Sequence, residues 1–139
     1  MQHVFHAWQN IEKRLGSAKQ VLLLLDFDGT LTPIVNRPEE AELSTEMEEI
    51  LKFLAKKREF RVAIISGRSL SDLKERIKIR GIIYVGNHGL EIEKGKKTFI
   101  YPQASKSIQT MKKLKRILKA RLKAIEGAIL EDKKVGIAI

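Results

Sequence analysis

Three short apolar runs, separated by amphipathic segments, limit what this chain can fold into. The runs lie at residues 21–25, 61–65 and 82–85. The first, VLLLL, shows no polar alternation, as expected for a parallel strand that is buried on both faces. Strands that alternate with helices form a parallel sheet, because right-handed crossovers return each helix to the sheet. The pattern predicts an α/β fold, a doubly wound, Rossmann-like parallel sheet with helices on both faces.

The segments around these runs carry helix signals. Thr45 and Glu48 have the spacing of a capping box, which predicts a helix from there to about residue 57. Apolar residues at helical spacing predict a helix at 4–15, and Ser69 with Asp72 opens a further predicted helix that runs through residue 77. We expect the helix at 4–15 to pack against the core.

Beyond residue 90 the pattern changes. Residues 90–93 and 98–101 flank a Lys-Gly-Lys-Lys tetrapeptide, which predicts a small hairpin. A long helix is expected next, because apolar residues recur on one helical face between 108 and 125. Two short strands are expected near 128–130 and 135–139.

A polar cluster follows each of the three apolar runs. The sequence DFDGT begins at Asp26, SGR begins at Ser66, and GNHG begins at Gly86. Ligands of wound α/β sheets collect at the carboxyl ends of the strands. We therefore expect all three clusters to meet at one edge of the sheet.

Composition removes several classes of protein. The chain has no cysteine, which excludes a disulfide scaffold, a zinc ribbon, an iron–sulfur site and a thiol nucleophile. No apolar run is long enough to span a membrane, and the first 15 residues lack the layout of a secretory signal. We expect a cytoplasmic protein with no membrane association.

The formal net charge of +10 comes mostly from residues 104–125, which include eight basic residues and no acidic one. A basic helical face suits phosphate groups or an acidic partner, but it is also the commonest way to solvate a helix. This stretch has no aromatic residue that could stack on bases, so nucleic acid binding is not expected. The eight are Lys106, Lys112, Lys113, Lys115, Arg116, Lys119, Arg121 and Lys123.

The segment from Asp26 to Thr32 has several interpretations. A hairpin turn is poorly supported, because the preceding apolar run does not alternate. A calcium loop fails, because Leu31 and Arg37 stand where glycine and glutamate belong. Two solvated aspartates remain an alternative. Two carboxylates at a strand end repel each other unless a cation lies between them, and Mg2+ is the natural one.

Such a pair can also do phosphoryl chemistry. One carboxylate can attack phosphorus while the other handles the proton of the leaving group. Gly29 would permit close approach of the backbone to a phosphate.

The segments LLLLDFDGTLTPI, VAIISGRSLSDL and YVGNHGLEIE together resemble the trehalose-6-phosphate phosphatase family of the haloacid dehalogenase superfamily. The resemblance is strong over residues 21–90. It implies a haloacid-dehalogenase-type core with a small α+β cap, and Mg-dependent hydrolysis of a small-molecule sugar phosphate, trehalose 6-phosphate, in trehalose biosynthesis. On this basis residues 1–102 are expected to form an incomplete core and 103–139 the beginning of a truncated cap.

The resemblance implies roles for individual residues. Asp26 would be the nucleophile that forms an aspartyl-phosphate, and a ligand of Mg2+. Asp28 would protonate the leaving oxygen, then activate water, and give its backbone carbonyl to Mg2+. Ser66 would hydrogen-bond the transferring phosphoryl group. The other residues implied in phosphate or substrate binding are Phe27, Gly29, Thr30, Gly67, Arg68, Asn87, His88, Glu131 and Lys133.

Several of these residues also have ordinary structural interpretations. Ser66 could cap a helix and Gly67 could be a turn residue. Arg68 could clamp an anion or pair on the surface. Glu131 and Lys133 could be a surface ion pair.

In the resembled family, a lysine and an acidic pair that complete the site follow the cap. This sequence ends at residue 139, inside an apolar run of the expected cap, so we expect it to lack both. We therefore expect the 139-residue chain to be inactive or nearly so. Two alternatives stay open: a capless phosphatase of the same superfamily, with Glu131 and Asp132 as the acidic pair, and a non-catalytic module whose basic helix binds nucleic acid or an acidic partner. Related sugar phosphates would suit the same catalytic residues.

Overall fold

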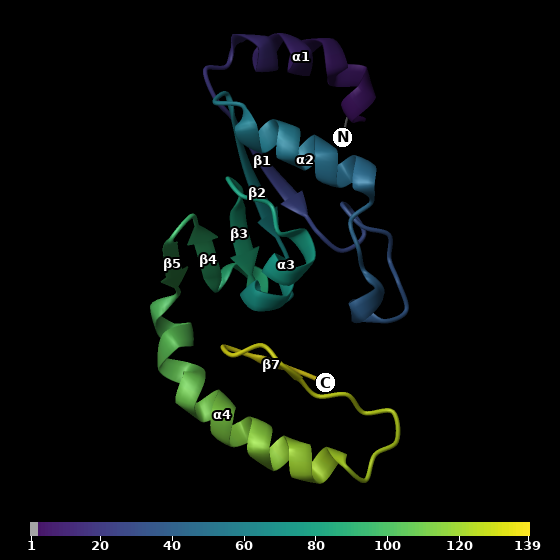
Figure 1. Cartoon of the computed structure of the whole chain (residues 1–139), viewed down its shortest axis with the longest axis vertical. Helices are drawn as coiled ribbons and strands as arrows, with labels where there is room; N and C mark the ends of the chain where they lie inside the picture. The colour runs from purple at the N-terminus through teal and green to yellow at the C-terminus, as the bar shows by residue number, and fades with distance from the viewer. Residues whose placement is uncertain (1–2) are drawn as a thin grey trace.

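The computed structural model describes residues 3–139, and a five-stranded sheet of order β1-β2-β3-β4-β5 forms its centre (Figure 1). The parallel strands β1 (Val21–Asp26), β2 (Phe60–Ile65) and β3 (Ile83–Gly86) confirm the predicted strand–helix–strand order. The hairpin β4 (Glu91–Lys94) and β5 (Lys97–Ile100) extends the sheet in antiparallel fashion. The sheet is therefore mixed and the fold is α/β.

Helices α2 (Thr45–Lys56) and α3 (Leu70–Ile77) cover one face of this sheet. The register places side chains from neighbouring strands in rows on that face, with Leu25 beside Ile64 and Ile64 beside Tyr84. These rows and the apolar stripes of the two helices form the core. Its fully buried members include Phe27, Leu51, Val62, Ile64, Leu73 and Ile77.

On the opposite face of the sheet, the part around β1 is open. Leu22 and Leu24 point to that face and are 58% and 60% exposed. Both crossover helices lie on the core side, because consecutive right-handed connections between neighbouring strands β1, β2 and β3 return to the same face. Within residues 3–139, no helix is packed over these two leucines.

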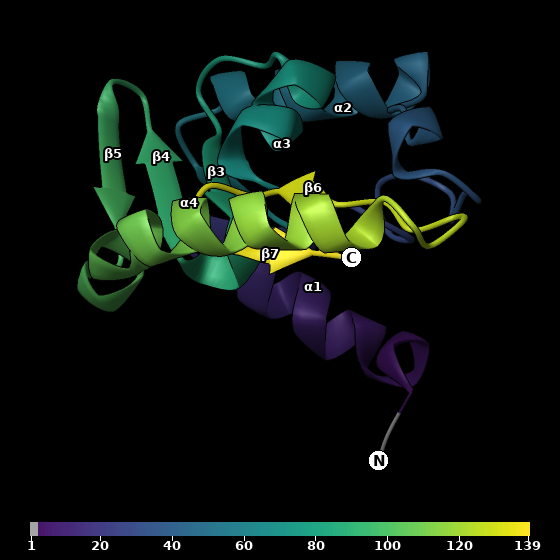
Figure 2. The ribbon, with the colours of Figure 1, turned by 90° about the horizontal axis from the view of Figure 1, so that it is seen from below.

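Helix α1 (Trp8–Ser17) does not pack against the core, so that expectation was wrong. It follows the 3-10 turn η1 (Val4–Ala7), has no buried residue, and lies apart from α2 and α3 (Figure 2). Its apolar stripe includes Trp8, which is 49% exposed. A helical period predicts such a stripe but cannot say which surface covers it.

Serine hydroxyls cap the N-termini of α2 and α3. Ser44 caps α2 by accepting a hydrogen bond from the Met47 backbone N–H at 3.1 Å, so the cap lies one residue before the predicted Thr45. Ser69 caps α3 in the same way through the Asp72 N–H at 3.2 Å, as its spacing indicated.

The C-terminal elements lie below the sheet in Figure 1. The long helix α4 (Pro102–Leu122) begins with a proline, whose missing N–H costs nothing in a first helical turn. The short strands β6 (Glu131–Asp132) and β7 (Ile137–Ala138) pair as a separate two-stranded sheet. The strand predicted near 128–130 begins three residues later than expected, at Glu131. Within residues 3–139, no helix combines the length and hydropathy that crossing a membrane requires.

Candidate active site

The chain turns sharply after β1, between the two aspartates. The backbone carbonyl of Phe27 accepts hydrogen bonds from the Leu31 and Thr32 N–H groups at 3.1 and 3.0 Å. Gly29 has φ of 81°, in the left-handed region, and Ile34 lies 3.2 Å from the place a Cβ would take. This turn leaves Asp26 exposed at the strand end and turns Asp28 toward β2.

The loop after β2 contacts this turn through its serine. The Ser66 hydroxyl donates to Asp28 Oδ2 at 3.2 Å and accepts from the Arg68 backbone N–H at 3.1 Å. A Cβ at Gly67 would lie 2.5 Å from the His88 imidazole, so a larger residue there would displace that ring. Ser66 does not cap α3, whose cap is Ser69, and its side chain instead reaches Asp28 across 38 positions of sequence.

The loop after β3 completes the convergence. Asn87 and His88 both have positive φ, at 50° and 56°. This geometry lets their N–H groups donate to Arg68 O at 2.7 Å and Ser66 O at 3.1 Å. Two consecutive non-glycine residues in this region are strained unless their surroundings fix them. The prediction that the three polar clusters meet at one edge of the sheet is confirmed.

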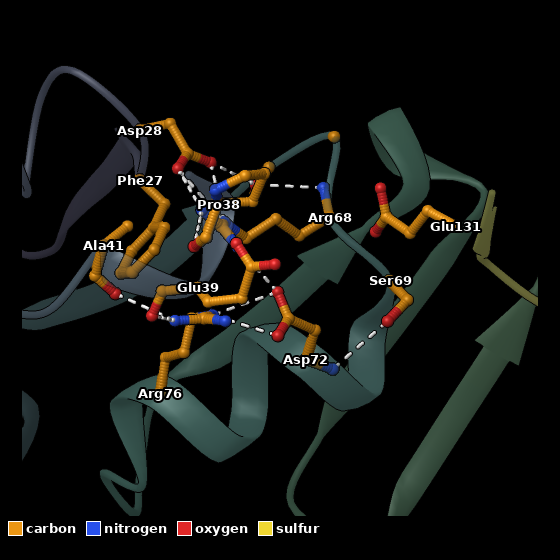
Figure 3. A network of polar contacts seen from close by, with 12 residues as sticks. Phe27, Asp28, Pro38, Glu39, Ala41, Arg68, Ser69, Asp72, Arg76 and Glu131 are labelled. Atoms are coloured by element: carbon orange, nitrogen blue, oxygen red, sulfur yellow. Dashed lines mark hydrogen bonds and ion pairs between the residues drawn. The ribbon is translucent and has the colours of Figure 1, made fainter. Parts of the chain in front are cut away.

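Arg68 is the centre of a network of ion pairs (Figure 3). Its guanidinium binds the Asp28 carboxylate through Nε at 3.0 and 3.1 Å and Nη2 at 2.7 Å. Nη1 donates to Asp72 at 2.9 Å, and Nη2 also donates to the Pro38 carbonyl at 2.8 Å. Arg68 is thus neither a free anion clamp nor a surface residue: it joins the turn after β1, α3 and the short helix η2 (Pro38–Glu40).

Opposing effects act on the ionisation of this network. Burial disfavours the cationic form of Arg68, but hydrogen bonds and charge from Asp28 and Asp72 outweigh it and raise the pKa of Arg68. Burial likewise disfavours the anionic form of Asp72, but hydrogen bonds and charge from Arg76 and Arg68 lower its pKa. Arg76 in turn donates to the Glu39 and Ala41 carbonyls at 3.0 and 3.1 Å, so the network holds residues 38–41 onto α3.

A pocket of about 370 Å³ opens beside Asp28. Lys133, from the turn after β6, donates to the Gly67 carbonyl at 2.8 Å and lies 3.6 Å from Glu131. The predicted site residues that line the pocket are Asp28, Gly67, Arg68, His88, Glu131 and Lys133.

The remaining predicted residues lie around this pocket or away from it. The Phe27 ring is fully buried, with the Arg68 guanidinium 5.4 Å from its centre, so only its backbone could contact a phosphate. Asn87 is 4% exposed and faces Glu91. Asp26, Thr30 and Ser66 do not line the pocket.

Among the residues that the structure describes, no hydrogen bond or ion pair reaches the Asp26 carboxylate. No group of three or more His, Cys, Asp or Glu residues that could hold a metal ion occurs in that part of the chain. The Asp26 carboxylate and the Asp28 carbonyl fit Mg2+, which usually takes one or two carboxylates and completes its shell with water and phosphate.

The alternative in which Glu131 and Asp132 complete a metal site is wrong. Asp132 pairs with Lys115 of α4, and the Lys115 and Lys134 hydrogen bonds lower the pKa of Asp132. Glu131 faces Lys133 instead. Neither forms a metal-binding group with the aspartates of β1 in the described residues.

Sequence reasoning missed Asp72, Arg76 and Glu91. Arg68, Asp72 and Arg76 follow one another at four-residue spacing, which favours ion pairs on a helix, but Arg68 lies before α3 begins. Glu91 belongs to the GLEIE segment and is only 2% exposed. A glutamate next to an apolar strand position carries no signal of such burial.

Comparison with known proteins places the chain in a family. The profile of the Trehalose-phosphatase family matches residues 24–139. Probable trehalose-phosphate phosphatase D of Arabidopsis thaliana is 33% identical over 133 residues, which cover 89% of this chain but 36% of that protein. An uncharacterized glycosyl hydrolase of Mycobacterium tuberculosis is 36% identical over 135 residues, covering 91% of this chain and 10% of that protein.

Comparison with solved structures agrees with this family assignment. The C-terminal domain of the C. albicans trehalose-6-phosphate phosphatase aligns with a TM-score of 0.74 and 27% identity, covering 91% of this chain and 44% of that one. The chain thus spans well under half the length of these proteins.

Proposed function

Since the chain belongs to the trehalose-phosphatase family, we propose that its pocket binds the phosphorylated end of trehalose 6-phosphate and that Asp26 is the nucleophile toward phosphorus. The observation that carries this proposal is the meeting of the Asp26 turn, the Ser66 loop and the Asn87 turn at one sheet edge beside the pocket. Asp26 is exposed, and within residues 3–139 no side chain pairs with it, so its oxygens are available for attack.

The proposed reaction has two steps. An Asp26 oxygen forms a bond to phosphorus while the bond from phosphorus to the sugar oxygen breaks, and protonated Asp28 gives its proton to that oxygen. Asp28 then takes a proton from water, which attacks the aspartyl-phosphate and releases phosphate. The Ser66 hydroxyl donates a hydrogen bond to the phosphoryl group. Mg2+, held by the Asp26 carboxylate and the Asp28 carbonyl, would supply neutralisation of phosphoryl charge.

The space beside the pocket supports a disaccharide ligand. A second cavity of about 640 Å³ shares Asn36, Pro38, Arg68 and Glu131 with the first. Ligand sites of this size suit drug-sized molecules, and two adjoining cavities give room for two sugar rings. Glu131 and Lys133 offer an acceptor and donors at the boundary, where sugar hydroxyls would lie. The division into a core at 1–102 and the beginning of a cap at 103–139 is part of this proposal.

The test uses the 139-residue chain with Mg2+ and trehalose 6-phosphate. Calorimetry should detect binding that Ser66→Ala and Lys133→Ala each weaken, because the first removes the proposed hydrogen bond to the phosphoryl group and the second removes a donor that lines the pocket. Acid quenching followed by mass spectrometry should find a phosphoryl group on the Asp26 peptide and none in Asp26→Asn. Glu49→Gln, at an exposed position of α2, is the matched control.

Binding that is equal in all four variants would contradict the proposed pocket, and a phosphoryl group that persists in Asp26→Asn would contradict the nucleophile. The expectation that the chain is inactive or nearly so stays a prediction. Phosphate release at a normal rate, abolished by Asp26→Asn, would contradict it.

A further inference from the structure

Glu91 is a buried carboxylate that the proposed reaction does not use. It opens β4, its side chain is 3% exposed, and it does not line the pocket beside Asp28. A buried carboxylate is costly unless it is paired and hydrogen-bonded. Glu91 has two such partners, and they lie on two different parts of the fold.

The first partner is Asn87 in the strained turn after β3. Its Nδ2 donates to Glu91 Oε2 at 2.6 Å. The same nitrogen donates at 3.0 Å to the backbone carbonyl of Lys133, in the turn after β6. The Asn87 amide group thus uses both of its hydrogens, one toward the core and one toward the C-terminal hairpin.

The second partner is Lys134, which lies on the hairpin itself. Its Nζ is 3.3 Å from Glu91 Oε1, and its backbone has φ of 65°. The neighbouring Lys133 points the other way and donates to the Gly67 carbonyl. Glu91 therefore contacts the hairpin both directly and through Asn87.

These contacts fix one wall of the pocket. Among the described residues, every hydrogen bond between the segment after α4 and the sheet domain involves Lys133 or Lys134. The wall residues Glu131 and Lys133 belong to that segment. With so few polar links, loss of one partner should free the whole turn.

We infer that Glu91 is a positioning residue that docks the Lys133–Lys134 turn onto the pocket, acting through Asn87 and Lys134. One part of the inference rests on the proposed function: when the turn is not docked, Lys133 no longer reaches the ligand. Docking itself is a property of the free chain and is measured without ligand.

Hydrogen exchange of residues 131–138, read by mass spectrometry, tests the docking. Glu91→Ala should speed exchange there by about tenfold or more, because a hydrogen bond to a charged group contributes that much to a local equilibrium. Glu91→Gln keeps an acceptor for Asn87 and loses only the ion pair with Lys134, whose side chain is exposed, so a rise below about fivefold is expected. This partial rescue separates positioning from mere filling of space.

Glu93→Ala is the matched control. Glu93 lies two residues along the same strand, pairs with Lys74 at 2.6 Å, and has no hydrogen bond to residues 131–139 in the described structure. It should leave exchange at 131–138 unchanged. Equal acceleration by Glu91→Ala and Glu93→Ala, or by neither, would overturn the inference.

Should Glu91→Ala fail to fold, Lys134→Met attacks the same pair from the exposed hairpin side and should speed exchange at 131–138 by about threefold. No acceleration in that variant would overturn the inference as well. Trehalose 6-phosphate is then added to the unmodified chain. Absence of binding with normal docking contradicts the proposed function and leaves the role of Glu91 intact.

Discussion

Arg68→Lys is the sharpest test of the network in Figure 3, because it keeps the charge and removes the geometry. The guanidinium of Arg68 reaches Asp28, Asp72 and the Pro38 carbonyl at once. An ammonium group has one nitrogen and can stay with one carboxylate.

The magnitude follows from the contacts that are lost. A hydrogen bond to a charged group contributes about 1.5–3 kcal/mol and one to a neutral carbonyl about 1 kcal/mol. Asp72 is 28% exposed, so the lower value suits its bond, and the carbonyl of Pro38 adds the neutral one. The free energy of unfolding should fall by about 2.5 kcal/mol, and the urea midpoint by about 1 M.

Urea unfolding followed by circular dichroism measures this loss. Arg61→Lys is the matched control, because Arg61 is exposed and its guanidinium donates only to the nearby Arg58 and Phe60 carbonyls. We expect it to change stability by less than about 0.5 kcal/mol. If both variants shift the midpoint equally, the network does not stabilise the fold and the reasoning is refuted.

Three other predictions use the same unfolding assay. Asp72→Asn should lower stability at pH 7 and flatten the acid side of the plot of stability against pH. The pKa of Asp72 is lowered in the folded chain, so its contribution to stability is present above the unfolded pKa and is lost as pH falls through the folded pKa. The wild-type chain should therefore lose this contribution below about pH 4. An unchanged acid slope in Asp72→Asn would contradict the assignment. Gly86→Ala should cost about 2 kcal/mol, because its Cβ would lie 2.6 Å from the Leu70 backbone nitrogen, whereas Gly16→Ala meets nothing within 4 Å and should be neutral or slightly stabilising. Ile64→Ala, at a fully buried position, should lower the free energy of unfolding by about 2–5 kcal/mol. Leu24→Ser, on the open face around β1, should lower it by less than about 0.5 kcal/mol. A large loss of stability in Leu24→Ser would show that this face is covered in solution.

Much of the fold was predictable because local patterns determine it. The apolar runs predicted β1, β2 and β3, and the direction of parallel crossovers then brought their carboxyl ends together. The open face around Leu24 was not predictable, because a run that is apolar on both sides indicates what burial would favour and not what is available to cover it.

For the site, the sequence predicted the positions of the aspartates but few of the contacts between side chains. Alternation along a strand places Asp26 and Asp28 on one side and Phe27 on the other, and the Phe27 ring is indeed buried in the core. The pairing of Arg68 with Asp28 was not predictable, because it spans 40 positions of sequence and depends on side-chain conformations that no spacing encodes. The same holds for Glu91, whose contact with Lys134 spans 43 positions.

The contacts of Ser66 suggest how phosphate binding and proton transfer are coupled under the proposed function. The serine hydroxyl has a single hydrogen, and here it is donated to Asp28 Oδ2. That oxygen also accepts from Arg68 Nε, while Oδ1 accepts from Nε and Nη2. A leaving oxygen therefore finds Asp28 fully engaged. When the hydroxyl turns to a phosphoryl group, Asp28 Oδ2 loses the serine and keeps only Arg68 Nε, so phosphate binding opens one acceptor position of Asp28 for the proton that it passes to the leaving oxygen.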